Sequence, residues 1–226
     1  MASTIIFEER LTIPPIDSLA DFRRWALSDE FPQTGRIDYF SGLIEVNMSP
    51  EDYYLHGKLK SEIVRVIGNR LLEGEEFGDV LTDSTRVTSV EGNLSVEPDV
   101  VIITHEALHS GRVKLIPKSS QEEGRFVEVE GSPDLIVEIV SDSSVNKDMK
   151  RLPNAYFAAG VLEFWLIDAR QDPHMFQIYR RGPVHYEPVA NDAEGFQRCE
   201  ILNRRYMLER SRNSSGRLRF ELVEKH

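Results

Sequence analysis

The sequence predicts an α/β or α+β fold, with a central mixed β-sheet flanked by helices. From His56 onward, segments with helical and strand periodicity follow in the order helix, three strands, helix, strand. The strand candidates are apolar on both faces, as expected for a sheet that helices cover on both sides. The chain has 226 residues, enough for one domain with a substantial core. We therefore expect one compact domain with N- and C-terminal elaborations.

Residues 1–34 are expected to form an N-terminal arm with one short helix. The helix begins at about Ser18, and its apolar residues recur on one face: Leu19, Phe22, Trp25 and Ala26. Two short strand candidates follow, "GRIDYF" and "LIEVNM", separated by Ser41-Gly42. This pattern predicts a β-hairpin.

The central domain is expected to span residues 35–190. Ser49-Pro50-Glu51 is a helix-start signal, and apolar residues then recur at helical spacing: Leu59, Ile63, Val66, Ile67 and Leu71. Strand candidates "DVLTDSTRVTS", "LSVEPDVVIIT" and "SPDLIVEIVS" come next, then a helix from about 148 to 159 and the strand "EFWLIDAR". "MFQIYRRGPVHYEPV" predicts a further hairpin, and residues 191–226 an extension or tail.

Composition argues for a soluble, intracellular protein. No run of about 18 apolar residues exists, so the sequence predicts no membrane-spanning helix and no membrane partner. Acidic residues interrupt the N-terminal segment "MASTIIFEER", where a signal peptide needs an apolar stretch. Cys199 is the single cysteine, which excludes an intrachain disulfide and a multi-cysteine zinc site. We expect a cytoplasmic location.

The formal net charge of −11 argues against a general nucleic-acid binder, because phosphate contacts need lysine and arginine. The charge is unevenly distributed, however. Between residues 203 and 220 there are six arginines and a single acid, Glu209. This segment is either a solvated strand or tail, or a local basic strip that meets a phosphate backbone.

Two acids lie at or inside apolar strand candidates. Glu138 interrupts "DLIVEIV", and Asp99 directly precedes "VVII". An isolated buried carboxylate costs several kcal/mol, so Glu138 must be paired, hydrogen-bonded or bound to a metal. Carboxylates on neighbouring strands suit Mg²⁺ or Mn²⁺, and the alternative is an internal ion pair with Arg86 or Lys150.

Two further polar candidates come from the first central helix. Glu62 lies at the edge of its core-facing stripe and could point at the sheet, or it is a surface charge. His56 precedes Glu62 by about one turn on the same side, and the alternative for it is a satisfied histidine at a helix start.

The segment "HEALH", from His105 to His109, matches the H-E-x-x-H pattern of zinc metalloproteases. That pattern works when two histidines share one face of a long helix. Here an apolar strand candidate runs directly into His105, and Ser110-Gly111 follows His109. We therefore expect a short surface helix, and a zinc peptidase is the third-ranked function.

The order helix with an acid, strand with Pro-Asp, strand with a glutamate, and helix resembles the PD-(D/E)xK nuclease superfamily. More closely, the chain resembles the Uma-two family of bacterial restriction-endonuclease-like proteins. The matching segments are "SGLIEVNMSPEDYYLHGKL", "VEPDVVII", "GSPDLIVEIVSDSS" and "KRLPNAYFAAGVLEFWLIDAR". They span about residues 35 to 170, and the last two are the most specific.

The resemblance implies a restriction-endonuclease-like core and a set of metal ligands. Asp99 and Glu138 would bind Mg²⁺ or Mn²⁺ together with the Ile139 carbonyl, and Glu62 would be the helix-borne acid. A lysine would orient the water or neutralise charge.

The expected lysine is missing from both of its usual positions. The superfamily lysine, two residues after the glutamate, is Val140 in this chain. Many members of the family carry it four residues before the tyrosine, which here is Leu152. Lys150 is the preferred substitute, and Lys147 is the alternative.

We therefore predict a metal-dependent endonuclease that hydrolyses DNA phosphodiester bonds, with Asp99, Glu138, Glu62 and Lys150 as catalytic residues. The alternative is a catalytically degenerate nuclease-fold protein that acts as a nucleic-acid or protein interaction module. The missing lysine and the acidic net charge favour that alternative. A homodimer is a further expectation, with the N-terminal hairpin and the C-terminal hairpin as the candidate dimerisation elements.

Overall fold

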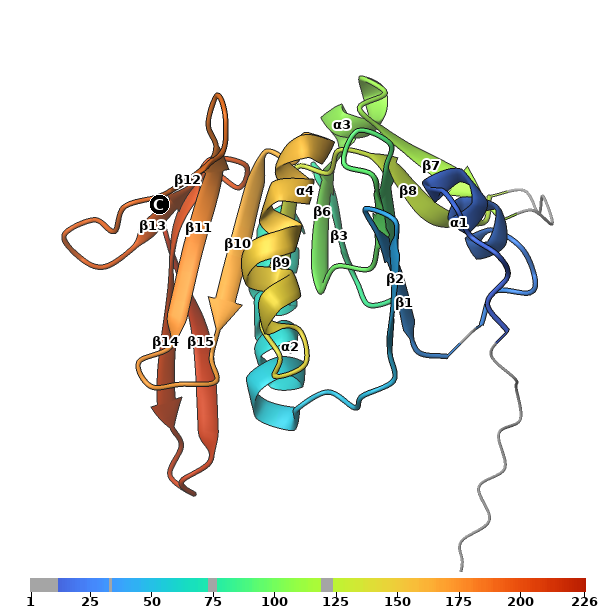
Figure 1. Cartoon of the computed structure of the whole chain (residues 1–226). Coiled ribbons are helices and arrows are strands. Elements are labelled where there is room, and N and C mark those ends of the chain that lie inside the picture. The colour runs from blue at the N-terminus through green and yellow to red at the C-terminus, as the bar shows by residue number, and fades with distance from the viewer. Residues whose placement is uncertain (1–11, 33, 73–76, 119–123) are drawn as a thin grey trace, which may run out of the picture.

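Over the residues that it describes, the computed structural model has two six-stranded sheets and a separate three-stranded sheet, with helices between and beside them (Figure 1). The α+β class predicted from the sequence is confirmed. The N-terminal arm predicted over residues 1–34 lies partly outside the described residues. The structure describes residues 12–32, 34–72, 77–118 and 124–226.

The central sheet is mixed, as predicted. Its strands are ordered β12-β11-β10-β9-β6-β3; β9 and β10 run parallel, and the other neighbours are antiparallel. The strand bounds are β3 Gly78–Thr82, β6 Val100–Thr104, β9 Leu135–Ile139, β10 Glu163–Asp168, β11 Met175–Arg181 and β12 Tyr186–Pro188. The last two strands form the hairpin predicted at this point of the sequence.

Helices α2 (Leu59–Leu72) and α4 (Leu152–Ala159) cover opposite faces of this sheet (Figure 1). Because successive side chains of a strand point to opposite faces, β9 contributes to both cores. Val137 packs with the α2 residues, whereas Ile136 packs with those of α4. Every residue of β9 is buried, including Glu138.

The second sheet has the order β2-β1-β5-β4-β8-β7 and packs against α1 (Leu19–Ala26). Ser18 caps α1, as the sequence predicted. Strands β1 and β2 form the predicted hairpin, and both turn residues, Ser41 and Gly42, have positive φ. The strand bounds are β1 Arg36–Phe40, β2 Leu43–Asn47, β4 Arg86–Ser89, β5 Leu94–Val96, β7 Val113–Pro117 and β8 Phe126–Gly131.

Two segments that the sequence predicted as single strands are each divided between the two sheets. The first splits into β3 and β4 at Asp83 and Ser84, whose φ values of 23° and 58° break an extended chain. The second splits into β5 and β6 around Pro98, which has no amide for the sheet ladder. The second crossing leaves Asp99 where the two sheets meet.

Both central helices begin with a π-helical segment. Asp52 caps η1 (Tyr53–Lys58), which leads into α2, and η2 (Lys147–Arg151) leads into α4. The helix predicted at 148–159 is therefore present, and it ends at Gly160, whose φ of 91° suits glycine. Among the described residues, no helix is long and apolar enough to cross a membrane.

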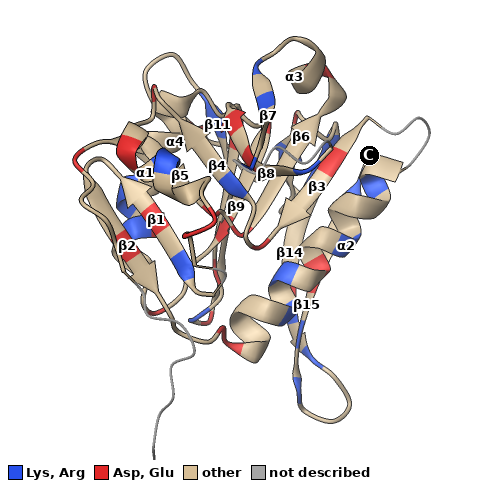
Figure 2. Ribbon diagram, turned by 90° about the vertical axis from the view of Figure 1, so that its right-hand side faces the viewer, with Lys and Arg blue, Asp and Glu red and all other residues tan. Residues whose placement is uncertain are grey.

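Residues 191–226, predicted as an extension or tail, include a three-stranded antiparallel sheet. Its strands are β13 Gln197–Cys199, β14 Arg204–Arg212 and β15 Leu218–Lys225. Apolar side chains of this sheet, including Tyr206 and Leu222, join the same core as α2. Figure 2 shows β14 and β15 alongside α2, with their connecting loop extending past its N-terminal end.

Candidate functional site

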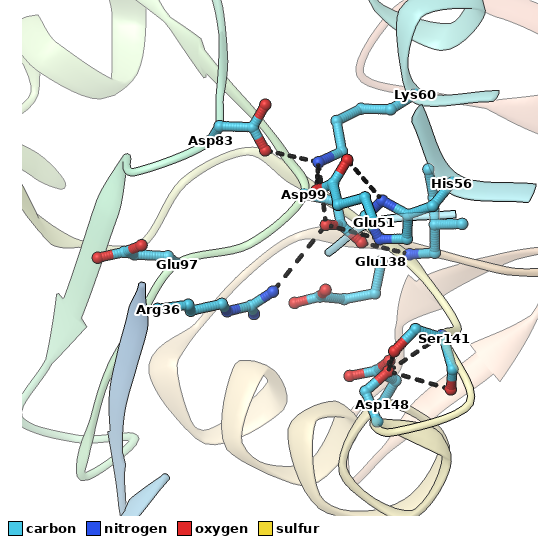
Figure 3. Close-up of polar contacts among 12 residues, drawn as sticks. Arg36, Glu51, His56, Lys60, Asp83, Glu97, Asp99, Glu138, Ser141 and Asp148 are labelled. Atoms are coloured by element: carbon cyan, nitrogen blue, oxygen red, sulfur yellow. Dashed lines mark hydrogen bonds and ion pairs between the residues drawn. The ribbon is translucent and has the colours of Figure 1, made fainter. Parts of the chain in front are cut away.

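A cavity of about 510 Å³ opens at the carboxyl end of β9. The η1 segment, the turn before β6, the loop after β9 and η2 each contribute to its wall. Figure 3 shows the charged side chains that converge there. They include Arg36, Glu51, His56, Asp99, Lys147 and Asp148.

Asp99 is the buried carboxylate at the centre of this site. It is 4% exposed, and its Oδ2 accepts a 2.7 Å hydrogen bond from the amide of Ile139. The bond fixes the carboxylate against the end of β9. Its other oxygen, Oδ1, lies 3.2 Å from His56 Nε2 and 3.6 Å from Lys60 Nζ.

These cations keep Asp99 charged. Burial alone would raise its pKa, but His56, Arg36 and Lys60 together lower the pKa of Asp99 to about 2. Burial likewise acts to lower the pKa of His56, and the contact with Asp99 outweighs it, so that this pKa is raised. The side chains around Asp99 thus surround a buried carboxylate with positive charge.

Glu138 lies in the same region, and its pKa is shifted in the opposite direction. It is 1% exposed, and Tyr156 of α4 donates a 2.5 Å hydrogen bond to its Oε1. Burial, followed by the nearby charge of Asp99, raises the pKa of Glu138 to about 8. Burial and the charge of Asp99 therefore both favour the protonated form of Glu138.

Asp148 of η2 is a second buried acid in the cavity wall, beside Asp99. Its Oδ2 accepts a hydrogen bond from Ser144, whereas its Oδ1 is buried without a hydrogen-bond partner. Burial raises the pKa of Asp148 to about 6, even though Ser144 acts to lower it. An unpartnered buried carboxylate oxygen is costly, which indicates a site adapted to a cation or an ordered donor.

Two positive groups lie near these acids, one on β1 and one on η2. Arg36 of β1 donates to Asp38 at 3.0 Å, and one of its terminal nitrogens lies 4.0 Å from Asp99 Oδ1. Lys147 of η2 binds the same Asp38, with Nζ 3.0 Å from Oδ2. Asp38 thus holds an arginine and a lysine at the cavity.

One set of side chains has suitable geometry for binding a metal ion. One ligand atom from each of Glu51, His56 and Asp99 lies within 4.8 Å of the others. Carboxylate oxygens suit Mg²⁺ and Mn²⁺, and imidazole nitrogen suits transition metals. In the present arrangement His56 bridges the two acids, because its Nδ1 lies 3.2 Å from Glu51 Oε2.

The structure brings together some of the predicted site residues and separates others. Asp99 and Glu138 lie close together, and Ile139 lines the cavity with its amide bound to Asp99. Glu62 points away, toward β15, where it accepts a hydrogen bond from the Leu222 amide. Lys150 is exposed and is not part of the cavity wall, whereas Lys147 is.

Both positions where the resemblance leads one to expect a lysine are filled by apolar core residues. Val140 and Leu152 are 2% and 0% exposed and belong to one cluster with Tyr156. Two residues were considered as ion-pair partners of Glu138. Arg86 instead binds Glu97 at 2.5 Å, and Lys150 is exposed, whereas Glu138 is buried.

Sequence reasoning missed Glu51, Arg36 and Asp148. Glu51 belongs to the helix-start signal "SPED", which already marked the N-terminal end of the helix that carries His56. No comparable local signal exists for Arg36, which reaches the site through strand pairing. "HEALH" forms the expected short helix, α3 (His105–His109), and neither histidine belongs to the metal-ligand set found among the described residues.

Known proteins similar to this chain identify its family. One solved structure, described as a "putative nuclease belonging to DUF820" from Anabaena variabilis ATCC 29413, matches with a TM-score of 0.61 and 20% identity, covering 84% of this chain and 92% of that one. That identity supports similarity of fold alone. No curated protein matches. The Uma2 family, described as "Putative restriction endonuclease", matches residues 19–206, and the chain belongs to that family.

Proposed function

We propose that this protein is a metal-dependent endonuclease that hydrolyses phosphodiester bonds of DNA. The observation that carries the proposal is an open cavity lined by the buried acids Asp99 and Asp148 and by the cations Arg36 and Lys147, with the raised-pKa acid Glu138 close to Asp99. Isolated structural ion pairs do not need an open cavity, whereas a substrate does. Membership of the family supports a nuclease and a nucleic-acid substrate.

The donor set fits a divalent cation, with Mg²⁺ or Mn²⁺ as the proposed ion. Asp99 would be its central ligand, with His56 and Glu51 on one side and Glu138 as the neighbouring acid. Such an ion would activate a water molecule and stabilise the charge that develops on the phosphate.

The protein's own side chains would hold the substrate in place. Lys147 has its Nζ fixed by Asp38 at 3.0 Å, so its charge is preorganised beside the acids. Arg36, held by the same Asp38, would contribute a second donor to the phosphate. Lys147 thus replaces Lys150 as the lysine proposed for catalysis.

A non-cleaving binding protein is the second candidate. The observation that favours it is the apolar filling of both usual lysine positions, Val140 and Leu152. In this alternative the cavity binds nucleic acid without hydrolysing it. Cleavage assays separate the two candidates directly.

The test measures nicking of supercoiled plasmid with Mg²⁺ or Mn²⁺, together with Mn²⁺ binding by calorimetry. Asp99→Asn and Glu138→Gln should each abolish nicking, and Asp99→Asn should also weaken Mn²⁺ binding. Lys147→Met should reduce the cleavage rate about 100-fold while Mn²⁺ still binds. Lys150→Met is the matched control and should leave the rate unchanged. Full activity in both acid variants would exclude this site, and binding without cleavage by the wild type would favour the second candidate.

A further inference from the structure

The β14–β15 hairpin carries arginines whose charge is not neutralised by neighbouring acids. Among the described residues, Arg210, Arg212 and Arg217 form no ion pair with a carboxylate. Arg210 and Arg212 instead donate to backbone carbonyls, Arg212 to Gly216 at 2.8 Å. Arg219 differs, since it pairs with Glu221 at 2.6 Å. The tip of the hairpin is therefore a concentration of positive charge on a chain with a net charge of −11.

The hairpin contacts two segments that lie next to cavity-lining residues in the sequence. On the η1 side, Lys58 follows His56 by two residues, and its Nζ lies 3.4 Å from the Leu218 carbonyl. On the other side, Arg210 donates to the carbonyls of Ala169 and Gln171, which flank the cavity residue Arg170. Figures 1 and 2 show the hairpin loop projecting at the N-terminal end of α2.

We infer that the β14–β15 hairpin is a phosphate-binding arm that holds the DNA backbone beside the cavity. The inference rests on the proposed function for the identity of the nucleic acid. Exposed guanidinium groups bind phosphate through planar pairs of donors, and an acidic protein needs such a local basic surface to approach DNA. The family match ends at Tyr206, so most of the hairpin lies beyond the segment that defines the family.

The test measures binding without turnover. Affinity for a short fluorescent DNA duplex is measured by anisotropy in chelator, between about 50 and 200 mM salt. Arg212→Gln combined with Arg217→Gln should lower the slope of log affinity against log salt by about 1 to 2, because each phosphate contact contributes about 0.9. Arg24→Gln combined with Lys114→Gln removes the same charge from the α1 and β7 side and should keep the slope near that of the wild type.

The outcomes separate this inference from the nuclease proposal. A hairpin variant that keeps the wild-type slope, or a wild type that does not bind DNA, overturns the inference. If the hairpin binds DNA in a salt-dependent way and no metal-loaded form cleaves it, the nuclease proposal is overturned and the inference about the hairpin is retained. Both double variants remove exposed side chains, and unchanged circular dichroism melting shows that altered binding is not due to misfolding.

Discussion

Replacing Glu138 by glutamine should stabilise the metal-free protein, and increasingly so as the pH rises. The folded-state pKa of Glu138 is about 8, above its ordinary value of 4.5, so the folded protein binds more protons between those values than the unfolded chain does. The unfolding free energy of the wild type therefore falls as pH rises through that window. Glutamine keeps an acceptor for Tyr156 and has no proton to lose.

The size of the effect follows from the pKa shift. Each unit corresponds to about 1.4 kcal/mol, so the shift of Glu138 sets an upper bound of about 5 kcal/mol at pH values above 8. Water entry and relaxation around the newly charged group reduce the penalty, and we expect on the order of 2 to 4 kcal/mol.

The assay is urea unfolding in chelator at pH values from 5 to 9. The difference in unfolding free energy, Glu138→Gln minus wild type, should increase with pH. Glu187→Gln, at an exposed position, is the control and should give a difference that does not change with pH. A pH-independent difference for Glu138→Gln would show that this glutamate is ionised throughout, and the raised pKa would then be wrong.

Three other substitutions test separate parts of the structure. His56→Ala removes one proposed ligand and should weaken Mn²⁺ binding at least about tenfold by calorimetry, and an unchanged affinity would remove His56 from the ligand set. Val140→Lys restores the superfamily lysine but buries an ammonium group beside Leu152, so urea unfolding should show a loss of about 3 kcal/mol without faster cleavage. Gly131→Ala places a Cβ 2.2 Å from the Arg112 carbonyl oxygen, at a residue whose φ is 114°. It should lower the free energy of unfolding by about 3 kcal/mol in the same assay. A variant as stable as the wild type would contradict this backbone geometry.

The sequence was informative where an acid interrupted an apolar strand. Burial makes an unpaired carboxylate costly, so the position of Glu138 in its strand was enough to indicate a special environment, and Asp99 was identified beside it. The class of fold was equally accessible, because β9 and β10 are apolar on both faces and need a helix on each side.

His56 and Glu62 do not share one side, contrary to the expectation. They are six positions apart in the sequence, so an α-helical rotation of about 100° per residue already leaves the two side chains about 120° apart. The π-helical segment η1 before α2 also changes the phase between them, because its turn is wider. His56 consequently faces Asp99, whereas Glu62 faces the amide of Leu222.

The division of the first strand candidate into β3 and β4 was also not predictable from local pattern. The pattern of "DVLTDSTRVTS" predicts one continuous strand, whereas the left-handed backbone at Asp83 and Ser84 depends on tertiary context. Contacts between distant segments are likewise not readable from local pattern. Asp38 holds Lys147 across 109 positions of the chain, and this pairing decides which lysine reaches the cavity.

The absence of lysine from Val140 and Leu152 is better explained by packing than by decay of a site. The two side chains lie in the same apolar cluster, so a lysine at either position would have to bury its charge in that cluster. In the proposed function, the positive group for the phosphate then has to come from outside the cluster. Lys147 meets this requirement because η2 carries it on the cavity wall and Asp38 of β1 fixes its Nζ. We propose that the apolar pair and Lys147 are two parts of one arrangement, and the activity of Lys147→Met is the measurement that distinguishes a relocated catalytic lysine from a lost one.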